Sequence, residues 1–151
     1  MELIIRLFFK SRFFNLIKIY DVKIVNDINI NLYNLYKTNR NISGSRINIG
    51  GDHSMSIATI QDSLIRYNDL KVIWIDAHAD INTFKSSNSK NIHGMPLSFL
   101  TGLDRGVINF NDKRLDFKNL MYIGLRDTDQ YEKEVIEKNN INYITSDMVN
   151  N

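Results

Sequence analysis

A chain of 151 residues, 43% hydrophobic and 24% charged, can bury the core of one globular domain, which excludes a disordered protein. The net charge of +2 is spread without a basic block, which argues against a nucleic-acid surface, and no apolar run approaches the roughly 20 residues that span a bilayer. Zero cysteines exclude disulfides and thiolate chemistry. We therefore expect a cytoplasmic protein that contacts neither nucleic acid nor membrane.

Two interpretations stay open for the first 20 residues, MELIIRLFFKSRFFNLIKIY. The run ELIIRLFF is typical of a first strand. Alternatively, Glu2, Arg6 and Lys10 lie four apart and would form the charged stripe of an amphipathic helix, as in a mitochondrial targeting or membrane-surface segment. We favour the strand, because basic residues interrupt any signal-peptide core.

Three elements are predicted in the middle of the chain. RINIGG (46–51) is typical of a short strand that ends in a glycine turn, and HSMSIATIQDSLIRY (53–67) has apolar residues at near-helical spacing. LKVIWID (70–76) is a continuous β-branched and aromatic run, which predicts a strand covered on both faces. The polar stretch 82–94 would form a loop on the carboxyl side of that strand, where ligand sites of open α/β sheets form.

The same alternation continues toward the end of the chain. NLMYIGL (119–125) predicts a second buried strand, DQYEKEVIEKNN (129–140) a charged helix, and INYIT (141–145) a short strand. Strands that alternate with helices imply right-handed crossovers and a parallel sheet. The sequence therefore predicts an α/β fold with a mainly parallel sheet.

The segment WIDAHADIN places Asp76, His78 and Asp80 at alternate positions directly after an apolar run. In an extended chain these side chains would share one face, where two acids repel each other unless a cation lies between them. GGDH adds His53 at the end of the preceding predicted strand. Oxygen and imidazole donors without sulfur favour manganese over iron, cobalt or zinc, whereas the structural alternative is that these residues cap strand ends.

Five segments, GGDHS, DAHADINT, SKNIHG, PLSFL and YIGLRDTD, resemble successive motifs of the arginase branch of the ureohydrolase family. The resemblance runs from about Asp21 to Tyr143. It implies a three-layer α/β/α sandwich with a paired Mn²⁺ site and hydrolysis of L-arginine to L-ornithine and urea. It is also compatible with a homo-oligomer, since members of the family often assemble.

The resemblance also implies roles for individual residues. His53 and Asp80 would bind one manganese and His78 the other, and Asp76 would bridge the two ions. Asp80 would further orient a metal-bridging hydroxide. His93 would relay a proton to the leaving amine, a role that suits an imidazole whose pKa lies near neutrality.

By the same resemblance, Asn82, Ser89 and Asn91 would bind the α-carboxylate of the substrate, while Asp129 and Glu132 would lie near its α-amino group. Hydroxyl and amide donors suit a carboxylate, and acids suit an ammonium group. Agmatinases, whose substrate lacks that carboxylate, do not share this loop. The structural alternative for the two acids is an N-cap and capping box at the start of the predicted helix.

Several departures from the family pattern bear on activity. The second Asp-x-Asp pair of the family is absent, so we expect residues 1–151 to form a single partial arginase-like domain with reduced metal occupancy. Lys90 replaces a glycine that is usual in the loop, and Phe84 replaces a proline. Arg126 and Asp127 are interpreted as a structural pair. A half-sheet would also expose a strand edge that invites association.

Three hypotheses follow. The chain is an arginase whose activity by itself is doubtful, or a catalytically inactive remnant that binds arginine, a metal or a homologous subunit. The third is an agmatinase-type ureohydrolase. Urea release from arginine or from agmatine would separate the first from the third, and metal binding without turnover would favour the second.

Overall fold

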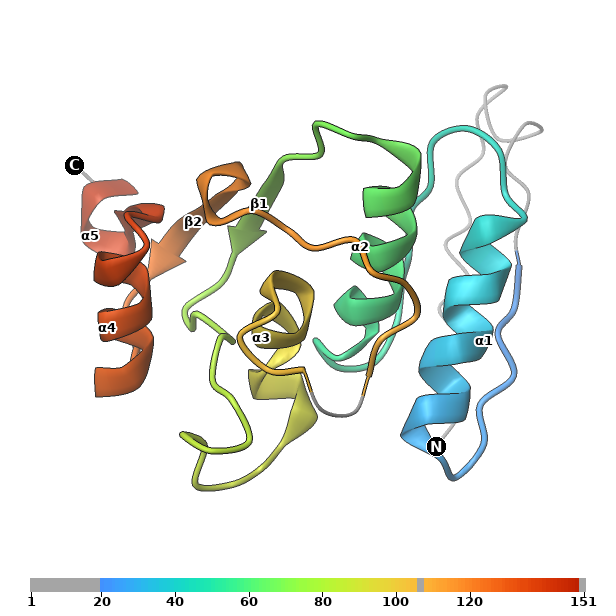
Figure 1. Cartoon of the computed structure of the whole chain (residues 1–151), viewed down its shortest axis with the longest axis horizontal. Coiled ribbons are helices and arrows are strands. Elements are labelled where there is room, and N and C mark those ends of the chain that lie inside the picture. Colours follow the sequence, from blue (N-terminus) through green and yellow to red (C-terminus); the bar gives the residue numbers. More distant parts are fainter. Residues whose placement is uncertain (1–19, 106–107, 150–151) are drawn as a thin grey trace, which may run out of the picture.

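The computed structural model describes residues 20–105 and 108–149 and forms a parallel three-stranded sheet with helices packed against it (Figure 1). The predicted N-terminal strand and its helical alternative lie outside these residues. Within the described ranges, no helix is both long and apolar enough to cross a membrane. The elements in chain order are α1 (Ile28–Arg40), α2 (Met55–Arg66), β1 (Val72–Ile75), η2 (Ile92–Gly94), α3 (Pro96–Thr101), η3 (Phe117–Asn119), β2 (Leu120–Leu125), α4 (Gln130–Lys138), β3 (Asn142–Thr145) and α5 (Ser146–Val149).

The strands lie in the order β1-β2-β3, and both pairings are parallel. Val72 pairs with Leu120, and Met121 pairs with Asn142. The predicted α/β class and parallel sheet are confirmed. So are the helices at 53–67 and 129–140 and the strands at 70–76, 119–125 and 141–145, each slightly shorter than the pattern suggested.

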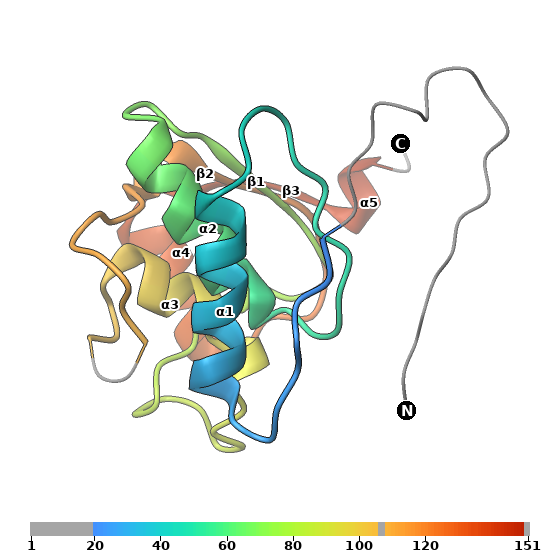
Figure 2. The ribbon, with the colours of Figure 1, turned by 90° about the vertical axis from the view of Figure 1, so that its right-hand side faces the viewer.

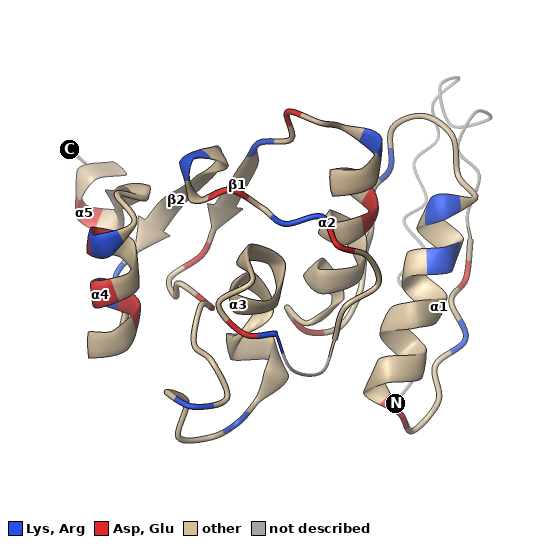
Figure 3. Ribbon diagram, viewed as in Figure 1, with Lys and Arg blue, Asp and Glu red and all other residues tan. Residues whose placement is uncertain are grey.

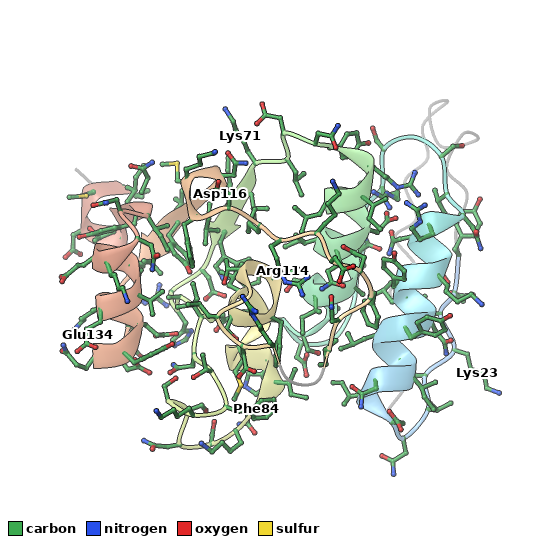
Figure 4. The ribbon with its side chains drawn as sticks, in the orientation of Figure 1. Lys23, Lys71, Phe84, Arg114, Asp116 and Glu134 are labelled. Atoms are coloured by element: carbon green, nitrogen blue, oxygen red, sulfur yellow. The ribbon has the colours of Figure 1, made fainter. Side chains whose placement is uncertain are left out.

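The helices α1 to α4 lie on one side of the sheet (Figure 2). The inward side chains of the strands form the main core with α2, α3 and α4. A second cluster joins α1, α2 and α3, and Phe84 packs its ring edge-on against Phe99 there, with ring centroids 5.9 Å apart (Figure 4). The aromatic ring at position 84 thus contributes to the core. The main core contains Leu64, Val72, Ala79, Ile81, Leu97, Leu100, Leu115, Leu120, Tyr122, Leu125, Val135, Ile136 and Ile141.

The other face of β1 is open, so the prediction of a strand covered on both faces is wrong here. Ile73 is 60% exposed and Ile75 is 77% exposed. Each is paired along the ladder with a half-buried residue of β2, Met121 and Ile123 respectively. The core side chains of α2, α3 and α4 pack on the opposite face, which leaves these two isoleucines exposed.

We expect Ile75→Lys to reduce concentration-dependent self-association several-fold without loss of the fold. An exposed apolar face favours association, as do the outer edges of β1 and β3, which pair with no strand in the described part of the chain. A lysine on this face opposes association. Light scattering over a concentration series measures the effect, with Asn88→Lys as a charge-matched control at another exposed position. Equal scattering from the two variants would show that the exposed face of β1 does not drive self-association.

The predicted strand at 46–51 is also wrong, because residues 46–50 form neither helix nor strand. Ile47 is 88% exposed and Ile49 is 65% exposed. The segment is held by side chains instead: Arg46 donates to Asp62 and to the Asn39 carbonyl. The side-chain contacts of Arg46 thus fix this segment outside the sheet, despite its strand-like alternation of apolar and polar residues.

A buried ionic network joins the carboxyl ends of α1 and α2, where Figure 3 shows basic residues in blue. The Asp62 side chain has no exposed surface and accepts from Arg46, from Arg66 Nε at 2.9 Å and from Arg40 at 3.5 Å. Arg66 also donates to the carbonyls of Asn39 and Arg40. One carboxylate therefore connects two helices and the irregular segment before α2.

Candidate metal centre

An imidazole and two carboxylates converge at the carboxyl end of β1. The ligand atoms of His53, Asp76 and Asp80 all lie within 4.8 Å of one another. His53 Nδ1 lies 3.0 Å from Asp76 Oδ2 and 2.5 Å from Asp80 Oδ2. His53 comes from the turn before α2, whereas both acids follow β1, so the cluster joins two segments that are far apart in the sequence.

The extended backbone predicted for residues 76–80 is not present. The chain bends at residues 76–78, directly after β1, and Asp80 has φ +50°, in the left-handed region. With this bend, Asp80 lies against His53, whereas His78 approaches the other oxygen of Asp76. The extended backbone is therefore wrong, although Asp76 and Asp80 do converge, both on His53.

His78 forms a second group beside the first. Its Nδ1 lies 3.5 Å from Asp76 Oδ1, and its Nε2 lies 3.5 Å from Asp127 Oδ2. The two oxygens of Asp76 therefore face two different imidazoles. Asp127 thus approaches His78, and among the described residues no ion pair joins it to Arg126. Its position at the carboxyl end of β2, the neighbour of β1, was the signal that could have placed it in the site.

The protonation of the cluster reflects its burial and its hydrogen bonds. The hydrogen bond with Asp80 raises the pKa of His53. Burial raises the pKa of Asp80, and this outweighs the lowering effect of the hydrogen bond with His53. A divalent cation would compete with the protons that these groups hold. Carboxylate oxygens with imidazole nitrogen, and no sulfur, form a donor set that fits a hard or borderline divalent ion.

The predicted α-amino-group residues have structural partners. Asp129 is the N-cap of α4 and forms a capping box with Glu132, as the structural alternative predicted. Glu132 is only 6% exposed, and its Oε1 also accepts from the Ile81 backbone N–H at 3.4 Å. Asp129 is exposed and accepts from Asn82 Nδ2 at 2.6 Å. Asp129 and Asn82 thus lie together and reach solvent, whereas the Glu132 carboxylate is occupied by backbone groups.

The loop residues predicted to bind the substrate carboxylate lie at the surface. Ser89 and Asn91 are both exposed, and Ser89 Oγ accepts from the Asn91 backbone N–H at 3.4 Å. Lys90 between them has φ +58°, a conformation that favours the glycine usual in the family. His93 is exposed on η2 and, within the described residues, its side chain makes no hydrogen bond or ion pair. These side chains are accessible to a ligand.

The contribution of Glu132 to the stability of the metal-free chain is expected to fall as pH rises above about 4.5. Burial raises the pKa of this carboxyl, so the folded chain holds a proton that the unfolded chain releases. The stability that Glu132 contributes is fully present below the ordinary pKa of glutamate. It is lost as pH rises through the higher pKa that Glu132 has in the folded chain. Urea unfolding between pH 4 and 8 should show a flatter profile for Glu132→Gln than for the wild type. Glu137→Gln, at an exposed position of the same helix, should leave the slope unchanged, and a change there would contradict the assignment.

Comparison with known proteins identifies the family of the chain. The family model described as the arginase family matches residues 9–151. The chain is 41% identical over 135 residues to an arginase of Plasmodium falciparum, covering 83% of this chain and 33% of that protein. It is 47% identical over 104 residues to an arginase of Plasmodium berghei, covering 66% of this chain and 29% of the relative.

Solved structures give the same result. The crystal structure of Entamoeba histolytica arginase in complex with L-ornithine superposes with a TM-score of 0.70 at 30% identity, covering 83% of this chain and 45% of that one. Arginase from Bacillus cereus superposes with a TM-score of 0.72 at 31% identity, covering 80% and 44%. The chain therefore spans about a third of these curated relatives and less than half of these solved arginases. With a family model that matches nearly its whole length, this chain belongs to the arginase family.

Proposed function

We propose that this chain carries the metal-binding and arginine-recognition half of a manganese-dependent arginase, which hydrolyses L-arginine to L-ornithine and urea. The observation that carries the proposal is the convergence of His53, Asp76 and Asp80 within 4.8 Å. Membership of the arginase family supports the reaction class. The L-ornithine in the Entamoeba histolytica structure is that protein's ligand, and it supports a basic amino acid as the substrate class here.

His53 and Asp80 would hold one cation, His78 the other, and Asp76 would reach both through its two oxygens. The orientation of those oxygens toward the two imidazoles supports this division. Divalent cations supply polarisation of the guanidinium group and a lower pKa for water. We add Asp127 to the second group on the basis of its 3.5 Å approach to His78.

For the substrate, Asn82, Ser89 and Asn91 would donate to the α-carboxylate, and Asp129 would face the α-amino group. The contact between Asn82 and Asp129 supports a single site that receives both groups. His93 would hold or release a proton at the leaving amine, and its exposure on η2 leaves its ring nitrogens accessible. In the described residues no observation favours agmatine over arginine.

Manganese titration by calorimetry and a urea-release assay on the purified chain test the proposal. We expect manganese binding and slow or absent turnover, since three donors on one cation and two or three on the other leave coordination positions to water. Agmatine serves as the matched substrate that lacks the carboxylate. Failure to bind manganese, or faster urea release from agmatine than from arginine, would contradict the proposal.

A further inference from the structure

Three backbone groups around Asp80 are tied to three different elements. The Tyr122 hydroxyl of β2 donates to the Ala79 carbonyl at 3.0 Å. The Leu97 N–H of α3 donates to the Asp80 carbonyl at 3.1 Å, and the Ile81 N–H donates to Glu132 Oε1 of α4 at 3.4 Å. The short segment 79–81 is therefore fixed from three directions.

These contacts are closed to water. Tyr122, Ala79 and Ile81 have no exposed surface, and Glu132 is 6% exposed. A buried carbonyl or N–H that loses its protein partner has no replacement, so each bond restrains the backbone strongly. Burial also raises the pKa of Tyr122, so its hydroxyl stays a donor throughout the physiological range.

The restrained segment has a conformation that it would not adopt alone. Asp80 has φ +50°, and non-glycine residues remain in this region only when their surroundings fix them. With this turn, Asp80 Oδ2 lies 2.5 Å from His53 Nδ1. An extended Asp80 would carry its carboxylate away from His53, which comes from a different part of the chain.

We propose that Tyr122 and Glu132 are positioning residues that hold the left-handed turn at Asp80 and thereby aim its carboxylate at His53. The inference rests on the proposed function in one respect: the turn would serve to bind a cation. Both residues act through the backbone of Ala79 and Ile81. This assigns to Glu132 a role in metal-ligand geometry beyond that of a capping-box residue.

Tyr122→Phe removes one hydroxyl and tests the proposal on the full chain. In the metal-free protein, NMR residual dipolar couplings of residues 79–81 should show Asp80 leaving the left-handed region. Manganese affinity should fall about 10-fold to 100-fold, as expected when a group that orients a ligand is lost. Tyr131→Phe makes the same chemical change on α4 without loss of a hydrogen bond within the described residues, and should change neither.

Two further variants separate positioning from general stability. Ile136→Val loosens the same core without removing a hydrogen bond to the segment 79–81 and should leave the Asp80 backbone and the manganese affinity unchanged. Glu132→Gln keeps an amide oxygen for Ile81 and should retain more affinity than Glu132→Met.

Unchanged couplings at residues 79–81 in Tyr122→Phe would overturn the inference, whether or not manganese binds. Equal losses of manganese affinity in Tyr122→Phe and Ile136→Val would also overturn it. If the wild type fails to bind manganese, the proposed function fails, while the couplings still decide whether Tyr122 holds the turn.

Discussion

Asp80→Asn is expected to weaken manganese binding by at least about 100-fold, more than a typical loss of a ligand-orienting group, while the metal-free chain keeps or gains stability. Asparagine preserves the size of the side chain and removes the charge that attracts the cation. Asparagine also tolerates the left-handed backbone at φ +50°. In addition, it removes a carboxylate that is unfavourable to bury, since burial raises the pKa of Asp80. Opposite effects on binding and on metal-free stability would identify Asp80 as a ligand.

Calorimetry with Mn²⁺ and urea unfolding in a chelator measure the two effects separately. Asp112→Asn, at an exposed position far along the chain, is the matched control and should change neither value. Manganese affinity of Asp80→Asn within a few-fold of the wild type would show that Asp80 is not a ligand.

The largest effect on stability is expected at Asp62, outside the site. Asp62→Ala should lower the free energy of unfolding by about 3–5 kcal/mol, since removal of one member of a buried ion pair leaves its partners uncompensated. Here the uncompensated groups are the guanidinium groups of Arg46 and Arg66, with Arg40 nearby. Burial already lowers the pKa of Arg46, which indicates how unfavourable an isolated charge is in that position.

Urea unfolding of Asp62→Ala and of the exposed Asp69→Ala provides the comparison, and the control should stay within about 0.5 kcal/mol of the wild type. Replacing Asp62 and Arg46 together by Leu and Met should recover part of the loss, because no buried charge is then left at either position. A loss below about 1 kcal/mol for Asp62→Ala would contradict the network's role.

The sequence by itself determined the elements whose signal is local. The apolar periodicity of α2 and α4 and the β-branched runs of β1 and β2 each predicted the observed element, because side-chain period and backbone period coincide there. The capping box of Asp129 and Glu132 is likewise local. The sequence also predicted that His53 lies near Asp76 and Asp80, but from the end of an adjacent strand. That strand is absent, and His53 reaches the two acids from the turn before α2.

Other features depended on contacts between distant segments. The strand expected at 46–51 is absent because Arg46 is drawn to a buried Asp62 sixteen residues later in the chain. The helices α1 and α3 went unpredicted, although Asp27 caps the first and Pro96 begins the second, because apolar periodicity was weak over α1 and short over α3. The exposure of Ile75 likewise depends on which helices lie over the sheet, and the sequence of the strand does not indicate this.

The geometry of the site is the clearest case. Alternating acids and histidine in WIDAHADIN predicted one shared face, yet the chain bends after β1 and Asp80 is turned back by bonds to Ala79, Asp80 and Ile81 from β2, α3 and α4. Only certain residue types can bind a divalent cation, and these can be recognised directly in the sequence. The directions of their side chains are set by buried hydrogen bonds from elements that lie well apart in the sequence, so only the tertiary structure decides them.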